Sequence, residues 1–422
     1  MRRQDTICLK TLNCTSLPKS QAGVAVPFAL LVLLSLVPAF AAGQMKLLSP
    51  NTGWVVEGNT LYWTRDGGRQ WKDITPVPPD AIRAGVTLRD QFFRDTAEGW
   101  TVISYPEKSA VPTLEAMRNQ KTLYSIAHTV DGGDSWAFSP LTYPALPEWI
   151  QNTFAGPASF YFLDSLHGWM DIAFEGNARP GKLLATEDGG RSWRWVNSPS
   201  YSGSITFLSS QDGWLVGGWA ADQLYVTHDG CKTWQEVSLS PPPQVGAAGH
   251  PTFEAPPTFQ DQMKGFLVVA YSGGSETPSK LVIYSTTDGG HTWNPSKILA
   301  AEQEAAGGGH PFAIVDSAII VSTGVRAKNV TVASVPLLDG RSSDVILSEQ
   351  GGLVLSFSDR NNGWAMSAIG GLLATHDGGL TWNNIAPRHV STPPPGRTMT
   401  IKVTSDAVFA LARPRCGDAA RI

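Results

Sequence analysis

The hydrophobic residues of this chain come in short runs separated by turn residues. The clearest example is the stretch 204–239, which holds four apolar runs, ITFL, GWLVG, QLYVT and TWQEV. Runs of this length, bounded by Gly, Asp and Ser, predict a four-stranded antiparallel meander. Gly and Pro recur too often along the rest of the chain for long helices. The pattern therefore predicts an all-β protein.

An eight-residue box recurs between the third and fourth expected strands. In the stretch above it reads THDGCKTW, and close copies begin at residues 64, 129, 186, 286 and 375. Asp-Gly favours a hairpin turn, because glycine accepts a positive φ without a Cβ penalty. We expect the box Asp to bond backbone amides of its own turn and the closing Trp to pack on the neighbouring unit. These structural residues are Asp66, Trp71, Asp131, Trp136, Asp188, Trp193, Asp229, Trp234, Asp288, Trp293, Asp377 and Trp382.

A Gly-aromatic pair precedes each box and completes a repeated unit. The pairs begin at Gly53, Gly99, Gly168, Gly213, Gly265 and Gly363. Repeats of about 40 residues with four strands each predict a β-propeller. The stretch 311–338 alternates like strands but lacks a box, so we interpret it as a degenerate seventh blade. Six or eight blades remain open, and two strands expected in 398–414 could complete the first or last blade.

The N-terminus has the features of an export signal. Basic residues precede the apolar run 23–42, and Ala39 and Ala41 form an A-x-A cleavage pattern. The alternative is an uncleaved membrane anchor, because the run is near the roughly 20 residues needed to span a bilayer. We expect a signal peptide or anchor over 1–42, a propeller over 43–415 and a short tail over 416–422. The protein would then be periplasmic or extracellular.

The charge and the cysteine content limit the ligands and cofactors that we expect for this chain. The chain has a net charge of −4, and because residues 1–42 carry +3 the rest carries −7. A domain with a net negative charge lacks the positively charged surface that is typical of nucleic-acid binding. Only Cys231 and Cys416 lie outside the leader, and export would permit a disulfide between them, although two separate thiols are the simpler interpretation. No metal-ligand spacing is present, and we expect no cofactor.

The boxes with their preceding GW, LY and T residues resemble the Asp-box or bacterial neuraminidase repeat. In the Gly-Trp-plus-box form, they resemble the photosystem II stability/assembly factor family over about 45–385. That resemblance implies a seven-bladed propeller that binds partner proteins. The box also occurs in sialidases, xyloglucan-cleaving glycosidases and sortilin-type receptors, so it indicates fold more than activity.

An enzyme remains the alternative interpretation. A sialidase-like site would need an Arg-Ile-Pro motif, which is absent, and three arginines, for which Arg179, Arg326 and Arg397 could be imagined. A glycosidase needs two carboxylates about 5–9 Å apart. The cluster Asp164, Asp171 and Glu175 offers the nearest candidates, although turn polarity explains it equally well.

Loop lengths point to a binding surface. In a four-stranded meander, the boxes share one rim, while the second-to-third and inter-blade connections share the other. The longest connections fall on that second rim, at 105–120, 175–181, 272–280, 75–85, 141–157 and 241–257. Loops on a rigid scaffold commonly carry function, and Tyr143, Trp149 and Phe154 are candidate binding aromatics. We therefore expect an exported, non-catalytic scaffold that binds a protein, with carbohydrate as a further ligand class and no nucleic acid.

Overall fold

The computed structural model describes most of the chain after its first 43 residues. The described residues are 44–107, 122–141, 154–174, 180–218, 220–245, 251–271, 279–301, 312–315, 318–326, 329–336, 343–347, 353–367, 371–379, 381–387, 400–404 and 407–411. The chain divides into a short unit, Met1–Phe40, and a large unit, Ala41–Ile422, which holds all of them. The expected export segment therefore lies outside the described residues.

Antiparallel sheets make up the large unit. Consecutive strands pair into sheets as follows: β1 (Met45–Ser49), β2 (Thr52–Glu57), β3 (Thr60–Thr64) and β4 (Lys72–Asp73); β5 (Thr87–Phe93), β6 (Gly99–Pro106), β7 (Thr122–Thr129) and β8 (Ala137–Pro140); β9 (Phe154–Phe162), β10 (Gly168–Phe174), β11 (Gly181–Thr186) and β12 (Arg194–Val196); β13 (Ser204–Phe207), β14 (Gly213–Gly217), β15 (Gln223–Thr227) and β16 (Gln235–Glu236); β17 (Pro251–Phe253), β18 (Thr258–Phe259), β19 (Gly265–Tyr271), β20 (Ser279–Thr286) and β21 (Asn294–Ala301); β22 (Phe312–Val315), β23 (Ala318–Arg326), β24 (Asn329–Pro336) and β25 (Ser343–Leu347); β26 (Leu353–Phe357), β27 (Gly363–Ser367), β28 (Leu372–Thr375) and β29 (Asn383–Asn384); β30 (Thr400–Thr404) and β31 (Ala407–Leu411).

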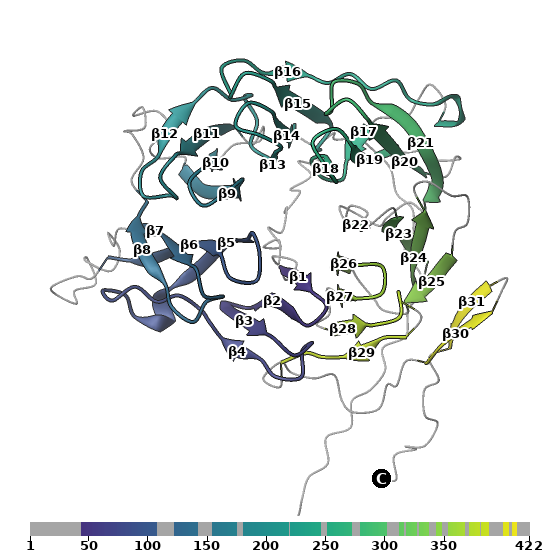
Figure 1. Cartoon of the computed structure of the whole chain (residues 1–422), viewed down its shortest axis with the longest axis horizontal. Helices are drawn as coiled ribbons and strands as arrows, with labels where there is room; N and C mark the ends of the chain where they lie inside the picture. Colours follow the sequence, from purple (N-terminus) through teal and green to yellow (C-terminus); the bar gives the residue numbers. More distant parts are fainter. Residues whose placement is uncertain are drawn as a thin grey trace, which may run out of the picture. The chain divides into compact units, whose positions relative to one another are not determined.

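The sheets from β1 to β29 follow one another around a ring, with the first strand of each four-stranded sheet nearest the centre, while β30 and β31 lie outside the ring (Figure 1). The all-β prediction and the propeller are confirmed. Two short 3₁₀ turns, η1 (Arg83–Gly85) and η2 (Pro243–Val245), are the helical elements of the described chain. Within that part of the chain, no helix has the length and apolar character required to cross a bilayer.

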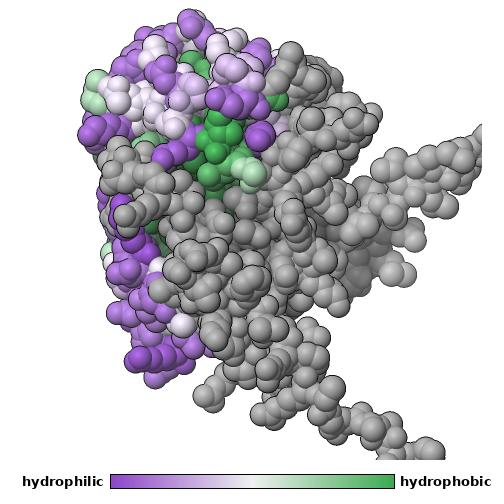
Figure 2. All heavy atoms as spheres, turned by 90° about the vertical axis from the view of Figure 1, so that its right-hand side faces the viewer, coloured by the Kyte–Doolittle hydropathy of each residue, from purple (hydrophilic) through white to green (hydrophobic). Residues whose placement is uncertain are grey.

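Hydrophobic clusters between neighbouring sheets form the core. Trp169 and Leu183 of the β9–β12 sheet, for example, pack against Ile205 and Leu215 of the β13–β16 sheet. A further cluster joins Met45 and Leu47 to Trp364, so the last sheet packs on the first and closes the ring without a covalent link. In the side view of Figure 2, hydrophobic residues are visible between hydrophilic outer surfaces. Burial between sheets supplies the main stabilisation of such a ring.

The Gly of each Gly-aromatic pair is required by close packing. In the β13–β16 sheet, Phe207 pairs with Gly213, and a Cβ at Gly213 would collide with the Phe207 ring. Phe93, Phe162, Phe259 and Phe357 occupy the same place beside Gly99, Gly168, Gly265 and Gly363. The ring of the first strand therefore lies across the start of the second, where only glycine fits.

Three expectations about the strands need revision. Six sheets match the predicted four-stranded blade, including the boxless β22–β25, but β17–β21 has five strands because its inner edge is split into β17 and β18. The C-terminal strands β30 and β31 pair with each other and complete neither the first nor the last sheet. The link expected over 141–157 is shorter, because β9 already begins at Phe154.

Candidate functional site

Each box forms the same hydrogen-bonded corner. In the second box, Thr129 Oγ1 donates to Asp131 Oδ1 at 2.8 Å and accepts from the Gly133 amide at 2.8 Å. The Ser135 amide donates to Asp131 Oδ1 at 2.9 Å, and its hydroxyl donates to Oδ2 at 2.6 Å. The same Thr and Asp bonds recur at Asp66, Asp188, Asp229, Asp288 and Asp377. The box carboxylates are thus used to hold their own turns.

These hydrogen bonds favour the ionised carboxylate. The Ser135 hydroxyl, followed by its amide, lowers the pKa of Asp131 to about 2, and the Thr233 side chain does the same for Asp229. A carboxylate that accepts several hydrogen bonds is stabilised in its charged form. Such a low pKa is the opposite of what a general acid at neutral pH requires.

Cys231 departs from the box pattern. It stands where the other boxes have the second Gly, and its φ of 67° lies in the left-handed region. The side chain is buried among Trp169, Phe207 and their neighbours, and desolvation raises the thiol pKa to about 12. Cys231 is a free thiol in the structure, while Cys416 lies outside the described residues.

The box tryptophans connect neighbouring sheets. Trp136 Nε1 donates to the Ile74 carbonyl at 2.8 Å, just after the outer strand of the preceding sheet. Trp234 reaches Asn197 at 2.8 Å in the same way, and Trp71 reaches Ile385 at 2.7 Å across the closing joint. Trp193 and Trp382 instead donate to Gly190 and Gly379 of their own boxes. Trp293 packs against Phe259 and its indole N–H is buried without a hydrogen-bond partner among the described residues.

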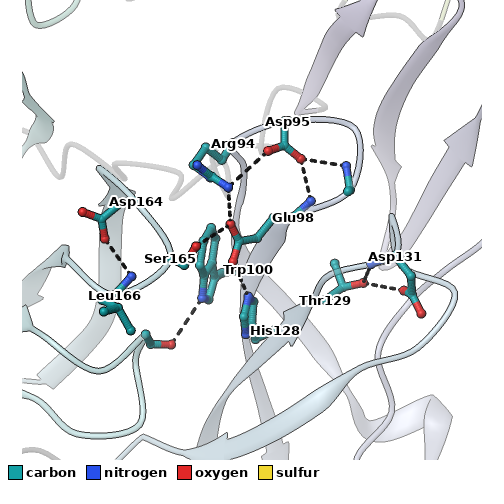
Figure 3. Close-up of polar contacts among 12 residues, drawn as sticks. Arg94, Asp95, Glu98, Trp100, His128, Thr129, Asp131, Asp164, Ser165 and Leu166 are labelled. Carbon is teal, nitrogen blue, oxygen red and sulfur yellow. Dashed lines mark hydrogen bonds and ion pairs between the residues drawn. The ribbon is translucent and has the colours of Figure 1, made fainter.

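A buried glutamate joins the second and third sheets at the box rim (Figure 3). Glu98 is nearly buried, and its carboxylate accepts from Arg94 at 2.5 Å and from the Ser165 hydroxyl at 3.1 Å. His128 Nε2 lies 3.1 Å from its other oxygen. The His128 ring stacks on Trp100 at 4.6 Å, and Trp100 stacks on Phe162 at 4.0 Å. This cluster is fully engaged in linking two turns.

Sequence reasoning missed the role of the residue before each Gly-aromatic pair. Glu98 occupies this position, and so do Asp212 and Asn362, which bond His228 and His376 at 2.8 and 2.7 Å. An acidic or amide residue here, together with a His in or beside the following box, was the available signal. His228 and His376 therefore lie on turns of the box rim.

Two further carboxylates connect neighbouring sheets. Asp90 of β5 accepts from the Phe160 amide of β9 at 3.0 Å. Asp171 of β10 is 0% exposed and accepts from the Ser202 hydroxyl at 2.5 Å and the Gly203 amide at 3.0 Å. Desolvation raises the pKa of each to about 7. These acids are perturbed by burial at joints between sheets.

The two described acids considered for glycoside hydrolysis, Asp164 and Asp171, bond different parts of the fold. Asp164 accepts from the Leu166 and His167 amides of its own turn at the box rim. Asp171 faces the connection that leads into the next sheet, and Glu175 lies outside the described residues, as do Arg179 and Arg397. Arg326 is on β23, although its side chain is not described. Within the described ranges, His, Cys, Asp and Glu side chains form no group of three suited to a metal.

The two rims of the ring differ in how much they vary. On the box rim, the inner turns of the boxed sheets span 50–51, 94–98, 163–167, 208–212, 260–264 and 358–362, so five of the six have the same length, and the boxes are alike apart from Cys231. On the other rim, the connections between second and third strands run from 58–59 to 107–121. The link 74–86 on that rim exposes Ile82, at 69%. We call this second surface the box-free rim.

The structure describes one of the three candidate binding aromatics. Tyr143 and Trp149 fall outside the described residues. Phe154 is the first residue of β9, where its backbone pairs with Phe174, so it belongs to a strand and not to a loop as expected. A binding role for these three residues stays a prediction.

Comparisons with known proteins give likenesses of fold at low identity. No protein-family model matches the chain, and no curated protein matches it. The similar solved structures include YCF48 bound to D1 peptide, at 20% identity and a TM-score of 0.39, with 89% of this chain and 92% of that chain covered. YCF48 from Cyanidioschyzon merolae gives 17% identity, a TM-score of 0.43 and coverages of 80% and 95%. The GH74 xyloglucanase from Xanthomonas campestris gives 10% identity and a TM-score of 0.49, covering 85% of this chain and 57% of that one. The chain is a β-propeller, similar in fold to these structures.

Proposed function

We propose that this chain is an exported, non-catalytic β-propeller that binds a protein partner through its box-free rim and acts as a scaffold or assembly factor. The observation that carries the proposal is the contrast between the rims. The boxes repeat one hydrogen-bonded corner six times, whereas the connections on the opposite rim differ in length from sheet to sheet. Loops of varied length on a rigid framework are the usual place for recognition.

Ile82 marks a described part of that rim. Its side chain is exposed to 69% although it is a large apolar residue. It follows the outer strand β4 and precedes η1, and its carbonyl accepts a hydrogen bond from the Gly85 amide at 2.8 Å. Exposed apolar side chains held in this way are suited to anchor a protein contact.

The use of the acids supports a non-catalytic role. The box carboxylates bond their own turns, Glu98 joins two turns, and Asp171 bonds the connection into the next sheet. Glycoside hydrolysis requires a pair of carboxyl groups that face a sugar across a pocket. The carboxyl groups described above are instead used to hold the ring together.

A loop deletion tests the proposal. We expect deletion of 108–120, between β6 and β7, to leave the ring folded because shortening a surface loop changes closure entropy little. The wild-type and deleted proteins would each be used to capture partners from the exported fraction, with thermal unfolding as the folding control. The proposal predicts an unchanged melting temperature and loss of the captured partner. Equal capture by both proteins would contradict it.

A further inference from the structure

A pocket of about 680 Å³ lies at the joint where the last sheet meets the first. It opens beside the outer strands β4 and β29, which lie next to each other in Figure 1. Its walls come from both sheets: Tyr62, Gly68, Arg69, Gln70 and Trp71 on one side, and Asn384, Ile385, Ala386 and Pro387 on the other. The volume falls within the usual range of small-molecule sites.

The pocket combines a fixed aromatic wall with unengaged polar groups. Trp71 is held by its hydrogen bond to Ile385 and by contact with Trp364, whose ring centre is 5.5 Å away. Among the described residues, the guanidinium of Arg69 makes no hydrogen bond or ion pair, although its charge helps to lower the pKa of Asp66, and the side-chain amide of Gln70 makes no hydrogen bond. Asn384 Oδ1 accepts a hydrogen bond from the Ala386 amide, so the NH₂ group of Asn384 is the part of this side chain that can donate to a ligand. The free groups are mainly donors.

The neighbouring joint provides an internal comparison. The sequence WKDITP (71–76) there corresponds to WNNIAP (382–387) at the closing joint, and both Trp–Ile contacts are present. At the neighbouring joint, Asp134 stands at the box position of Arg69 and pairs with Arg65 and Lys72, at 3.2 and 2.7 Å. The charged groups at the neighbouring joint therefore form ion pairs with one another. At the closing joint, Arg69 forms no such pair among the described residues.

We propose that this pocket binds a saccharide that carries a carboxylate. Trp71 and Tyr62 offer apolar ring surface to the sugar, while Gln70 and Asn384 can donate to its hydroxyl oxygens. Arg69 matches a carboxylate through two parallel hydrogen bonds. The described residues that line the pocket include no acidic side chain, and the nearest box acid, Asp66, is already bonded to Thr64 and the Gln70 amide. An acceptor-rich, anionic sugar fits this excess of donors.

Calorimetric titration of the full chain tests the assignment. The probes are a tetrasaccharide of alternating glucuronate and N-acetylglucosamine, uncharged cellotetraose, and tetraglutamate as an acidic peptide. We expect Arg69→Met and Asn384→Ala each to raise the Kd for the acidic tetrasaccharide by about tenfold, because a hydrogen bond to a charged or polar ligand group is lost. Arg191→Met, at the same box position in the third sheet, is the matched control and should change the Kd less than about twofold.

The outcomes separate this pocket from the partner-binding rim. Ile82→Asp should leave the saccharide Kd unchanged, so the two proposals fail independently. No heat on titrating the acidic tetrasaccharide into the wild type would overturn the inference. Binding of cellotetraose or tetraglutamate at least as tightly as the acidic sugar would also overturn it, as would equal losses in Arg69→Met and Arg191→Met.

Discussion

At the scale of single residues, the box is a turn held by one hydroxyl and one carboxylate. The Thr hydroxyl bonds both the Asp side chain and the amide of the second Gly position, so it closes the turn from inside. The Asp then bonds the residue four positions later. Because every partner lies within the box, the corner can recur without help from neighbouring sheets.

Replacement of a box carboxylate should destabilise the fold in a pH-dependent way. The folded pKa of Asp229, about 2, lies below the ordinary value of 3.8. Its contribution is therefore fully present above about pH 4 and is lost as the pH falls toward the folded pKa. We expect Asp229→Ala to lower the melting temperature at pH 7 and to lower it less at pH 2.5. A melting-temperature difference that stays constant with pH would argue against an ionised Asp229 in the corner, and partner capture should be retained.

Cys231 allows a test of backbone strain. A non-Gly residue at its φ of 67° costs on the order of 1 kcal/mol. Cys231→Gly removes that strain, whereas Cys231→Ala keeps it. We therefore expect the free energy of unfolding in urea to be about 1 kcal/mol higher for the Gly variant than for the Ala variant. Gly190→Ala, at the same box position with a φ of 89° and no close Cβ contact, is the matched control and should be destabilised. An Ala variant at 231 as stable as the Gly variant would show that the turn relaxes.

At the scale of elements, the joints between sheets decide the stability of the ring. Apolar clusters bury the interfaces, and hydrogen bonds of Asp90 and Asp171 join neighbouring sheets. Asp171 is only partly satisfied at its joint, because one of its carboxylate oxygens is buried without a hydrogen-bond partner among the described residues. A buried acceptor without a partner carries a desolvation cost.

Asp171→Asn should therefore become relatively more stable as the pH rises. Burial raises the folded pKa of Asp171 to about 7, above its ordinary 3.8. The folded state then binds more protons than the unfolded state between these values, so wild-type stability falls across that interval and levels off above pH 7. In urea unfolding, the free energy of unfolding of the variant relative to that of the wild type should be higher at pH 8 than at pH 5. Asp164→Asn is the control: the folded pKa of Asp164 lies below its ordinary 3.8, so its contribution is constant between pH 5 and pH 8 and its difference from the wild type should not change. An Asp171→Asn difference that does not change with pH would refute a neutral buried carboxyl.

At the scale of the whole molecule, the proposal predicts binding without glycoside turnover. The engaged acids lead us to expect that purified protein hydrolyses neither sialosides nor β-glucans. Release of reducing sugar from these substrates, abolished by Asp171→Asn, would favour the enzyme instead. The same assay on the Asp164→Asn variant would show whether turn acids take part.

The strands and turns followed from the sequence because their causes are local. The period-two apolar runs, Asp-Gly turns and Gly-Trp pairs each act within a few residues. The positions of Glu98, Asp90 and Asp171 at joints did not follow, since they depend on which sheets become neighbours. The split inner edge at β17 and β18 was missed because Pro and Gly in 241–257 read as a link. The closing pocket arises from residues more than 300 positions apart, so no local pattern reveals it.

The most direct test compares two exposed apolar residues on opposite rims. Ile82 on the box-free rim and Val130 on the box rim are 69% and 66% exposed, so replacement by Asp should disturb folding equally little. The measurement is the amount of partner retained by each variant in chemical cross-linking of the exported fraction, with melting temperatures as the folding control. We expect Ile82→Asp to lose at least about tenfold of the cross-linked partner, the scale of a binding anchor, and Val130→Asp to retain it. Loss in Val130→Asp with full retention in Ile82→Asp would place recognition on the box rim and contradict the proposed function.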